Sequence, residues 1–264
     1  MKTRLSKQQI DSYRENGFVV LNNFLAPEEL ETWRASLDDA IKQRGQQRIL
    51  HHEEKVDENA YYNNVFVQRV NLWQDNEKIR QLMLDRRLGK LAAQLAGVDG
   101  IRIWHDQALI KQPYGNPTAW HLDNPYWSFS SRQAISIWVA LDNATLANGC
   151  LWYIPGSHKT AKYDSVGIGK NLAGLFRLYP EWAKLEAQPA DCRAGSCVFH
   201  NGLVAHGAGA NMTPRARRAM TCAYMPDGST FNGQKNVLPD AYFKSLKPGD
   251  LLNDQHQNPL IWKS

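Results

Sequence analysis

The sequence predicts a mainly β fold, a sandwich or jelly roll with helices packed outside it. Helical patterns dominate the first third of the chain, whereas short apolar runs of strand length follow from about residue 100, separated by turn sequences. We therefore predict one domain over residues 1–264, with a helical part over about 1–98, a jelly-roll core over about 99–230 and a C-terminal extension over 231–264.

Three helices are predicted in the first part. The segment Ser6–Gln9 has the S-x-x-Q form of a capping box, and Gly17 ends that helix before a short strand over 18–21. Proline at the first turn, followed by two acidic residues, begins the second helix. The second helix is expected to run from Pro27 to about Gln43 and stop near Gly45, and the third to cover about Glu77 to Leu95 and end at Gly97.

Five apolar runs in the later part are strand candidates. They are rich in β-branched and aromatic residues, and turn dipeptides such as Asn148-Gly149 separate them. The runs begin at Ile101, Ala134, Cys150, Gly195 and Ala219. Many short strands with turns between them indicate packed sheets rather than alternating strands and helices.

Charge and composition exclude several classes of protein. The net charge is +5 and the pI about 9.0, but acidic and basic residues are interleaved, and we find no arginine-rich tail, zinc finger or RNA-binding motif. We expect no nucleic acid partner, and we interpret the charge as a solvated surface that accommodates an anionic small ligand. No signal core and no long apolar run occurs, and the four cysteines form no C-x-x-C pair. We therefore expect a cytoplasmic protein with free thiols and no membrane contact; the sequence leaves the oligomeric state open.

The segment 119–124 contains an H-x-D motif, His121-Leu122-Asp123. In a strand, residues i and i+2 point to the same face, so His121 and Asp123 project together while Leu122 points the other way. An imidazole and a carboxylate on one face suit iron(II), and a second histidine would complete a 2-His-1-carboxylate set with open positions. The motif alone is weak, because a chain with eight histidines contains an H-x-D by chance nearly as often as not.

The segment 199–217 offers the second histidine. Asn211 and Met212 lie midway between His206 and Arg217. If the chain turns there as a hairpin, His206 and Arg217 face one another across two paired strands. A guanidinium binds a carboxylate through two parallel hydrogen bonds, which suits a dicarboxylate that chelates iron with its other end.

Two neighbouring arginines compete with Arg217 for this role. Arg218 has the wrong parity for that face, and Arg215 lies close to the turn. The alternative for all three arginines is a solvated strand edge.

The chemical motifs occur in a fixed order along the chain. They comprise Asn16–Val20, the helix start at Pro27–Glu29, Trp120–Asp123, Trp138–Asp142, Asn148–Leu151, Pro155–Lys159, and the spacing from His206-Gly207 through Asn211 to Arg217. In this order they resemble the phytanoyl-CoA dioxygenase family of iron(II)- and 2-oxoglutarate-dependent oxygenases. The resemblance spans nearly the whole chain and is far more specific than any single motif.

The resemblance implies a double-stranded β-helix, a cupin-like jelly roll, in which His121, Asp123 and His206 bind iron(II). It implies 2-oxoglutarate as cosubstrate, O2 as oxidant and Arg217 on the distal carboxylate of 2-oxoglutarate. It also implies that Trp138 lines the cosubstrate site, which Gln107 or Lys111 is expected to approach. Related halogenases have a small residue in place of the carboxylate ligand, so the presence of Asp123 favours hydroxylation.

The implied reaction is oxidation, most simply hydroxylation, of an unactivated C–H bond of a small organic molecule, with release of succinate and CO2. Two alternatives are a non-catalytic jelly-roll protein that binds a ligand or metal, and a cupin-type metalloenzyme that does not use 2-oxoglutarate. Arg217 opposite His206 argues against the second alternative.

Residues next to the motifs are candidate substrate contacts. Asn124, Tyr126 and Trp127 follow the H-x-D motif, with loop packing as the alternative, and His200 shares strand parity with His206 if no bulge intervenes. Three further sites carry histidine. His105 either orients the cosubstrate region or is a core histidine with its hydrogen bonds satisfied, and we favour the second interpretation. We expect His158 to shape the pocket wall from a turn and His51-His52-Glu53-Glu54 to be a solvated loop.

Overall fold

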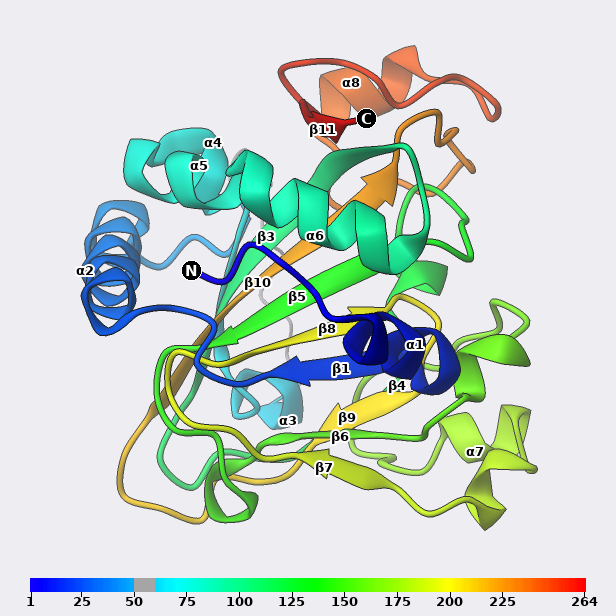
Figure 1. Ribbon diagram of the computed structural model, residues 1–264. Coiled ribbons are helices and arrows are strands. Elements are labelled where there is room, and N and C mark those ends of the chain that lie inside the picture. Colours follow the sequence, from blue (N-terminus) through cyan, green and yellow to red (C-terminus); the bar gives the residue numbers. More distant parts are fainter. Residues whose placement is uncertain (50–59) are drawn as a thin grey trace.

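Two antiparallel β-sheets face each other in the computed structural model, which describes residues 1–49 and 60–264 (Figure 1). In these residues the larger sheet has the strand order β1-β8-β5-β10-β3-β11, with β2 also paired to β3, and the smaller sheet has the order β4-β9-β6-β7. The strands are β1 (Phe18–Leu21), β2 (Val67–Val70), β3 (Gly100–Lys111), β4 (Thr118–His121), β5 (Ile135–Ala140), β6 (Leu151–Tyr153), β7 (Gln188–Ala190), β8 (Cys197–Asn201), β9 (His206–Ala208), β10 (Arg217–Pro226) and β11 (Leu260–Lys263). The facing sheets confirm the predicted jelly roll.

Helices cover the outer face of the larger sheet (Figure 1). The α-helices are α1 (Lys7–Asn16), α2 (Pro27–Arg44), α3 (Ala60–Asn63), α4 (Leu72–Asp75), α5 (Glu77–Met83), α6 (Arg86–Ala96), α7 (Leu175–Leu178) and α8 (Asp240–Ser245), and the short 3-10 helices are η1 (Asn124–Tyr126), η2 (Leu146–Asn148), η3 (Ser157–Lys159) and η4 (Trp182–Lys184). Apolar residues of α1, α2, α5 and α6 share one buried cluster with Ile135, Ile137 and Val139 of β5. Because side chains alternate along a strand, Ser136 and Trp138 of β5 point to the inner face.

The ends of the first two helices follow the sequence signals. Ser6 accepts a hydrogen bond from the backbone of Gln9, and the Gln9 side chain accepts one from the Ser6 backbone, which confirms the capping box. Gly17 has a φ of 82°, a left-handed conformation that favours glycine and ends α1. Pro27 begins α2 as predicted.

The single helix predicted from Glu77 to Leu95 is wrong, because two helices occupy this segment. The Asp85 side chain accepts a 2.7 Å hydrogen bond from the backbone of Arg87 and caps α6. An aspartate that binds a free backbone N–H favours a helix start over a continuous helix, and α5 therefore ends at Met83.

The hairpin predicted between His206 and Arg217 is also wrong. Strand β9 pairs with β4 and β6 of the smaller sheet, whereas β10 pairs with β3 and β5 of the larger sheet. The loop 209–216 therefore crosses from one sheet to the other, and the buried Asn211 amide holds it by donating to the carbonyls of Gln112 and Arg215 at 2.9 and 2.8 Å. His200 lies on β8 of the larger sheet, whereas His206 lies on β9 of the smaller sheet. The prediction that the two histidines share one face of a single strand is therefore also wrong.

Both terminal parts of the chain add a strand to the larger sheet. Strand β1 pairs with β8. Strand β11 pairs with β3, which lies between β11 and β10. Over the described residues, no helix combines the length and the apolar character needed to cross a membrane. The segment His51-His52-Glu53-Glu54 lies outside the described residues.

Candidate metal centre and cosubstrate cavity

Strand β4 carries the first part of the metal-binding motif. The strand ends at His121, and Asp123 follows in the turn before η1 rather than within the strand. The backbone N–H groups of Asp123 and Asn124 both donate to the Gly202 carbonyl, at 3.0 and 2.8 Å, and fix this turn. Leu122 packs on the opposite side in a separate apolar cluster, so His121 and Asp123 do project together as expected.

The two histidines are register partners across β4 and β9. His121 lies opposite His206, and their ring centroids are 4.2 Å apart. Asp123 Oδ1 lies 3.5 Å from His121 Nε2 and 3.7 Å from His206 Nε2. One ligand atom from each of the three residues lies within 4.8 Å of the others, which is the arrangement of a facial 2-His-1-carboxylate site.

Backbone carbonyls orient both histidines. His121 Nδ1 lies 2.8 Å from the Ala119 carbonyl, and His206 Nδ1 lies 3.0 Å from the Val204 carbonyl. Since a carbonyl only accepts, each Nδ1 carries the hydrogen and each Nε2 lone pair is left for a metal.

Burial and mutual repulsion keep this group of residues in a ligating form. Burial, with the neighbouring His121 ring, lowers the pKa of His206 to about 3, so His206 is neutral at physiological pH. Burial acts to raise the pKa of Asp123, but His206, His121 and His200 together hold it well below its usual range. A neutral imidazole beside an ionised carboxylate is the form that binds iron(II).

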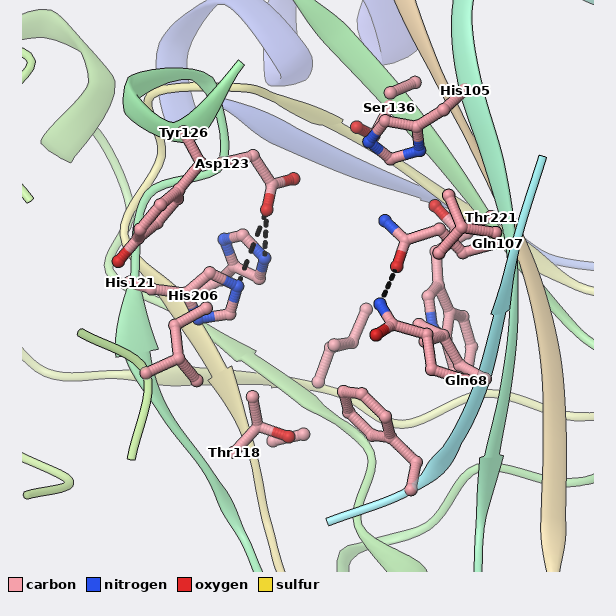
Figure 2. Close-up of a pocket in the computed structure, with 18 of the residues that line it drawn as sticks. Gln68, His105, Gln107, Thr118, His121, Asp123, Tyr126, Ser136, His206 and Thr221 are labelled. Atoms are coloured by element: carbon pink, nitrogen blue, oxygen red, sulfur yellow. Dashed lines mark hydrogen bonds and ion pairs between the residues drawn. The ribbon is translucent and has the colours of Figure 1, made fainter. Parts of the chain in front are cut away.

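A cavity of about 340 Å³ lies between the two sheets and contains the three ligand residues (Figure 2). The metal-ligand side chains point into it from the smaller-sheet side, and His105, Gln107 and Thr221 point into it from the larger sheet. Other lining residues include Arg48, Ile49, Phe66, Gln68, Val70, Thr118, Tyr126, Trp127, Ser136, Trp138, Ile168, His200, Arg217, Asn236 and Val237.

Arg217 reaches this cavity from β10 as a buried cation. Its side chain is almost completely buried, and within the described part of the chain its Nε and Nη1 atoms have no hydrogen-bond partner. The guanidinium carbon lies 5.0 Å from the centre of the Trp138 ring, which faces Thr221 across β5 and β10. Burial lowers the pKa of Arg217 to about 10, so it stays charged at neutral pH. A buried, charged donor pair without an acceptor fits the carboxylate of a ligand.

The other two predicted cosubstrate residues differ in position. Gln107 lines the cavity and accepts a hydrogen bond from Gln68, whose strand β2 is paired to β3. Lys111 is fully buried behind the cavity lining, where its Nζ donates to the Asn116 carbonyl at 2.7 Å. Burial, with Arg217 on the neighbouring strand, lowers the pKa of Lys111 to about 7.

The predicted substrate contacts separate into two groups. Tyr126, Trp127 and His200 line the cavity. The Asn124 amide is fully buried in its own loop, where it donates to the Phe129 carbonyl and accepts from the Ser131 N–H, both at 3.0 Å. The prediction of a substrate contact is therefore wrong for Asn124, because both polar atoms of its side chain are used to shape the loop.

Two histidines differ from their predicted roles. His105 is buried, but among residues 1–49 and 60–264 its Nδ1 has no hydrogen-bond partner, and its ring lines the cavity, so the interpretation as a satisfied core histidine is wrong. His158 lies outside the cavity lining and packs against Gly17, with Nε2 3.2 Å from the Arg14 carbonyl. Its predicted place in the pocket wall is wrong, because η3 directs the ring toward α1.

Several polar residues that line the cavity were not predicted from the sequence, among them Gln68, Thr118, Ser136 and Thr221. Ser136 and Thr221 each interrupt an otherwise apolar strand, in Ile135-Ser136-Ile137 and Met220-Thr221-Cys222. A polar residue at the inward position of a buried strand is a signal that could have revealed both.

Comparison with known proteins agrees with this geometry. The family model for phytanoyl-CoA dioxygenase matches residues 13–219. The chain belongs to the phytanoyl-CoA dioxygenase family. Among curated members, the phytanoyl-CoA dioxygenase of Arabidopsis thaliana is 22% identical over 81% of this chain and 87% of its own length. The ectoine dioxygenase of Bordetella parapertussis is 26% identical, over 94% of this chain and 87% of its own length.

Solved structures show the same fold. The non-haem α-ketoglutarate-dependent carbocyclase SnoK of nogalamycin biosynthesis is 28% identical, with a TM-score of 0.79 over 97% of this chain and 96% of its own. EctD of S. alaskensis, crystallised with 2-oxoglutarate and 5-hydroxyectoine, is 20% identical, with a TM-score of 0.71 over 96% of this chain and 86% of its own, and shows the fold alone. With the His121–Asp123–His206 site, this family member is a 2-oxoglutarate-dependent non-haem iron dioxygenase.

Proposed function

We propose that this dioxygenase hydroxylates a C–H bond of a small organic molecule, with His121, Asp123 and His206 as the iron ligands and Arg217 as the anchor of 2-oxoglutarate. The proposal depends most on Arg217. Its guanidinium lines the same cavity as the three ligand residues, and two of its nitrogen atoms lack an acceptor. A cupin-type enzyme without a dicarboxylate cosubstrate would leave this buried charge uncompensated.

Each part of the cavity has a separate task in this mechanism. When bound, iron and 2-oxoglutarate supply the redox chemistry, in which the keto acid becomes succinate and CO2 and one oxygen atom of O2 enters the C–H bond. His121, Asp123 and His206 would hold the iron, and the cavity beside them would admit the keto acid and O2. Arg217 would donate hydrogen bonds to the distal carboxylate, and the indole of Trp138 keeps water from the guanidinium face.

The end of the cavity opposite Arg217 is the proposed substrate site. Ile49, Val70, Trp127 and Val237 pack in one apolar cluster with Ala223, the register partner of His105 six residues along β10 from Arg217, while Arg48 and Asn236 add polar groups to the cavity. His105 supplies an imidazole that is neutral at physiological pH, because burial lowers its pKa to about 4. We infer that the substrate is an organic molecule with an apolar body and a hydrogen-bonding group that meets His105.

Other features of the proposal come from the sequence alone. We propose that residues 1–264 form a single domain, that the protein is cytoplasmic and that nucleic acid is not a partner. Interleaved charges and the absence of nucleic-acid motifs support the last point.

An anaerobic titration of the apo-protein with iron(II) and then 2-oxoglutarate tests the proposal. We expect a visible charge-transfer band that requires both additions, and we expect it to be absent in His121→Ala and Asp123→Ala, since each variant removes one of three ligands. His256→Ala is the matched control, because His256 is exposed and remote from the cavity. Succinate production at the normal rate by Asp123→Ala would refute the assignment of the iron site.

A further inference from the structure

His200 joins the metal-binding carboxylate to a buried tyrosine. His200 Nε2 lies 3.1 Å from Asp123 Oδ2, and His200 Nδ1 lies 3.1 Å from the hydroxyl of Tyr153. Both side chains are buried, and they come from opposite sheets, His200 from β8 and Tyr153 from β6. One imidazole thus bridges the interior of the jelly roll beside the metal site.

The chemistry of the two partners fixes the hydrogen on this ring. An ionised carboxylate only accepts hydrogen bonds, so the hydrogen lies on Nε2 of His200 and is donated to Asp123. In the neutral ring Nδ1 is then an acceptor, and the phenol O–H of Tyr153 is the donor that it meets. Both ring nitrogens are satisfied in this one tautomer.

Tyr153 is held firmly enough to fix His200. Its ring stacks on Phe18 with a centroid separation of 4.3 Å and an interplanar angle of 11°. Its other neighbour is His206, its register partner on β9, at 5.7 Å between ring centroids. A fully buried phenol between two rings has few alternative rotamers, so its hydroxyl direction toward His200 is constrained.

The two oxygens of Asp123 consequently have different environments. Oδ1 faces Nε2 of His121 and of His206, the two nitrogens free to bind a metal. Oδ2 is turned away from them and accepts from His200. Backbone carbonyls orient the two histidine ligands, whereas His200 is the side chain that orients the carboxylate ligand.

We propose that His200 is a positioning residue that presents only Oδ1 of Asp123 to the metal, and that Tyr153 locks His200 in place. The inference depends on the proposed iron site and goes beyond it, since His200 itself binds neither metal nor cosubstrate. A carboxylate that gave both oxygens to the metal would take one of the positions needed by the keto acid and O2. The hydrogen bond from His200 to Oδ2 opposes that change because it would have to break.

Binding of Co(II) alone to the full-length apo-protein tests this inference without turnover. In His200→Leu we expect Co(II) affinity to fall by about 10- to 100-fold and the visible spectrum of bound Co(II) to change, because loss of a hydrogen bond to a ligand has effects of this size and frees Oδ2. In His200→Gln the amide N–H replaces Nε2–H, so we expect most of the affinity and the wild-type spectrum to return. A purely packing role of the imidazole would not be rescued in this way.

Two further variants complete the design. Tyr153→Phe removes only the hydroxyl, and we expect a smaller loss of Co(II) affinity, about two- to tenfold, from weaker orientation of His200. His158→Leu is the matched control, since His158 is a half-buried histidine outside the cavity lining, and its Co(II) affinity should equal that of the wild type. If His200→Leu does not fold, Tyr153→Phe still tests whether the hydrogen bond between Tyr153 and His200 supports metal binding.

The outcomes separate the two proposals. Wild-type affinity and an unchanged Co(II) spectrum in His200→Leu, or in Tyr153→Phe where His200→Leu does not fold, would overturn the positioning role. Failure of the wild-type protein itself to bind Co(II) would instead overturn the metal site on which the inference depends.

Discussion

The two ends of the cavity are built by different parts of the chain. The Arg217 end consists of neighbouring strands, where the register of β5 and β10 places Trp138 opposite Thr221 and the Arg217 guanidinium lies over the Trp138 ring. The opposite end is assembled from separated segments, including Ile49, the loop around Trp127, and Val237. The family model covers Arg217 but ends at residue 219, before Val237.

The unpartnered polar atoms at the two ends also differ. Arg217 offers two donor atoms of a buried cation, and His105 offers one nitrogen of a neutral ring. The Arg217 guanidinium fits an anion, whereas the neutral His105 ring fits a neutral hydrogen-bonding group. The difference teaches that paired strands hold the buried cation, while separated segments of the chain surround the neutral imidazole.

The largest expected effect concerns His105, at the end of the cavity opposite Arg217. The folded-state pKa of His105, about 4, lies below the unfolded value of about 6.5, so the unfolded chain binds more protons between these values. The contribution of His105 to the unfolding free energy is therefore complete above pH 6.5 and is lost as pH falls to 4. This contribution is about 3 kcal/mol, and we expect it to disappear in His105→Phe.

Urea unfolding of the apo-protein at several pH values measures this effect. His256→Phe is the matched control, because its imidazole is exposed. An identical pH dependence for wild type and His105→Phe would show that His105 is already solvated or paired, and the contrast between the two ends would be lost.

The next effect concerns the cosubstrate end. We expect Arg217→Met to weaken 2-oxoglutarate binding by roughly 1.5–3 kcal/mol, about ten- to a hundredfold or more, because a charge-assisted hydrogen-bond pair is lost. Arg215→Met removes an exposed arginine from the same loop region and should leave the affinity unchanged. Titration of the iron-loaded protein with 2-oxoglutarate compares them, and His105→Phe should behave like Arg215→Met if the two ends are independent.

The smallest effect concerns the aromatic face beside Arg217. We expect Trp138→Leu to weaken 2-oxoglutarate binding by about 0.5–1 kcal/mol, roughly two- to fivefold, through loss of the cation–π contact. Trp262→Leu, on the distant strand β11, is the control in the same titration. A loss as large as that of Arg217→Met would mean that Trp138 contacts the cosubstrate itself as well as the guanidinium.

The sequence by itself determined the chemistry of the site and the local order of the fold. The H-x-D motif, His206 and Arg217 supplied the residue types of the site, and the i, i+2 spacing predicted that His121 and Asp123 project together, although Asp123 lies in the turn after β4. Capping signals likewise placed the starts of α1 and α2, because a cap depends on residues within one turn.

Only the tertiary structure decided how the separated segments meet. Spacing between His206 and Arg217 was compatible with a hairpin, yet the two strands belong to opposite sheets and the residues approach the cavity from opposite sides. The same is true of His200, which meets Asp123 from a different sheet, and of His105, whose unpartnered nitrogen is a result of burial. Periodicity specifies the face on which a side chain lies, whereas the partner of a strand is selected by packing between residues distant in sequence, which no local pattern encodes.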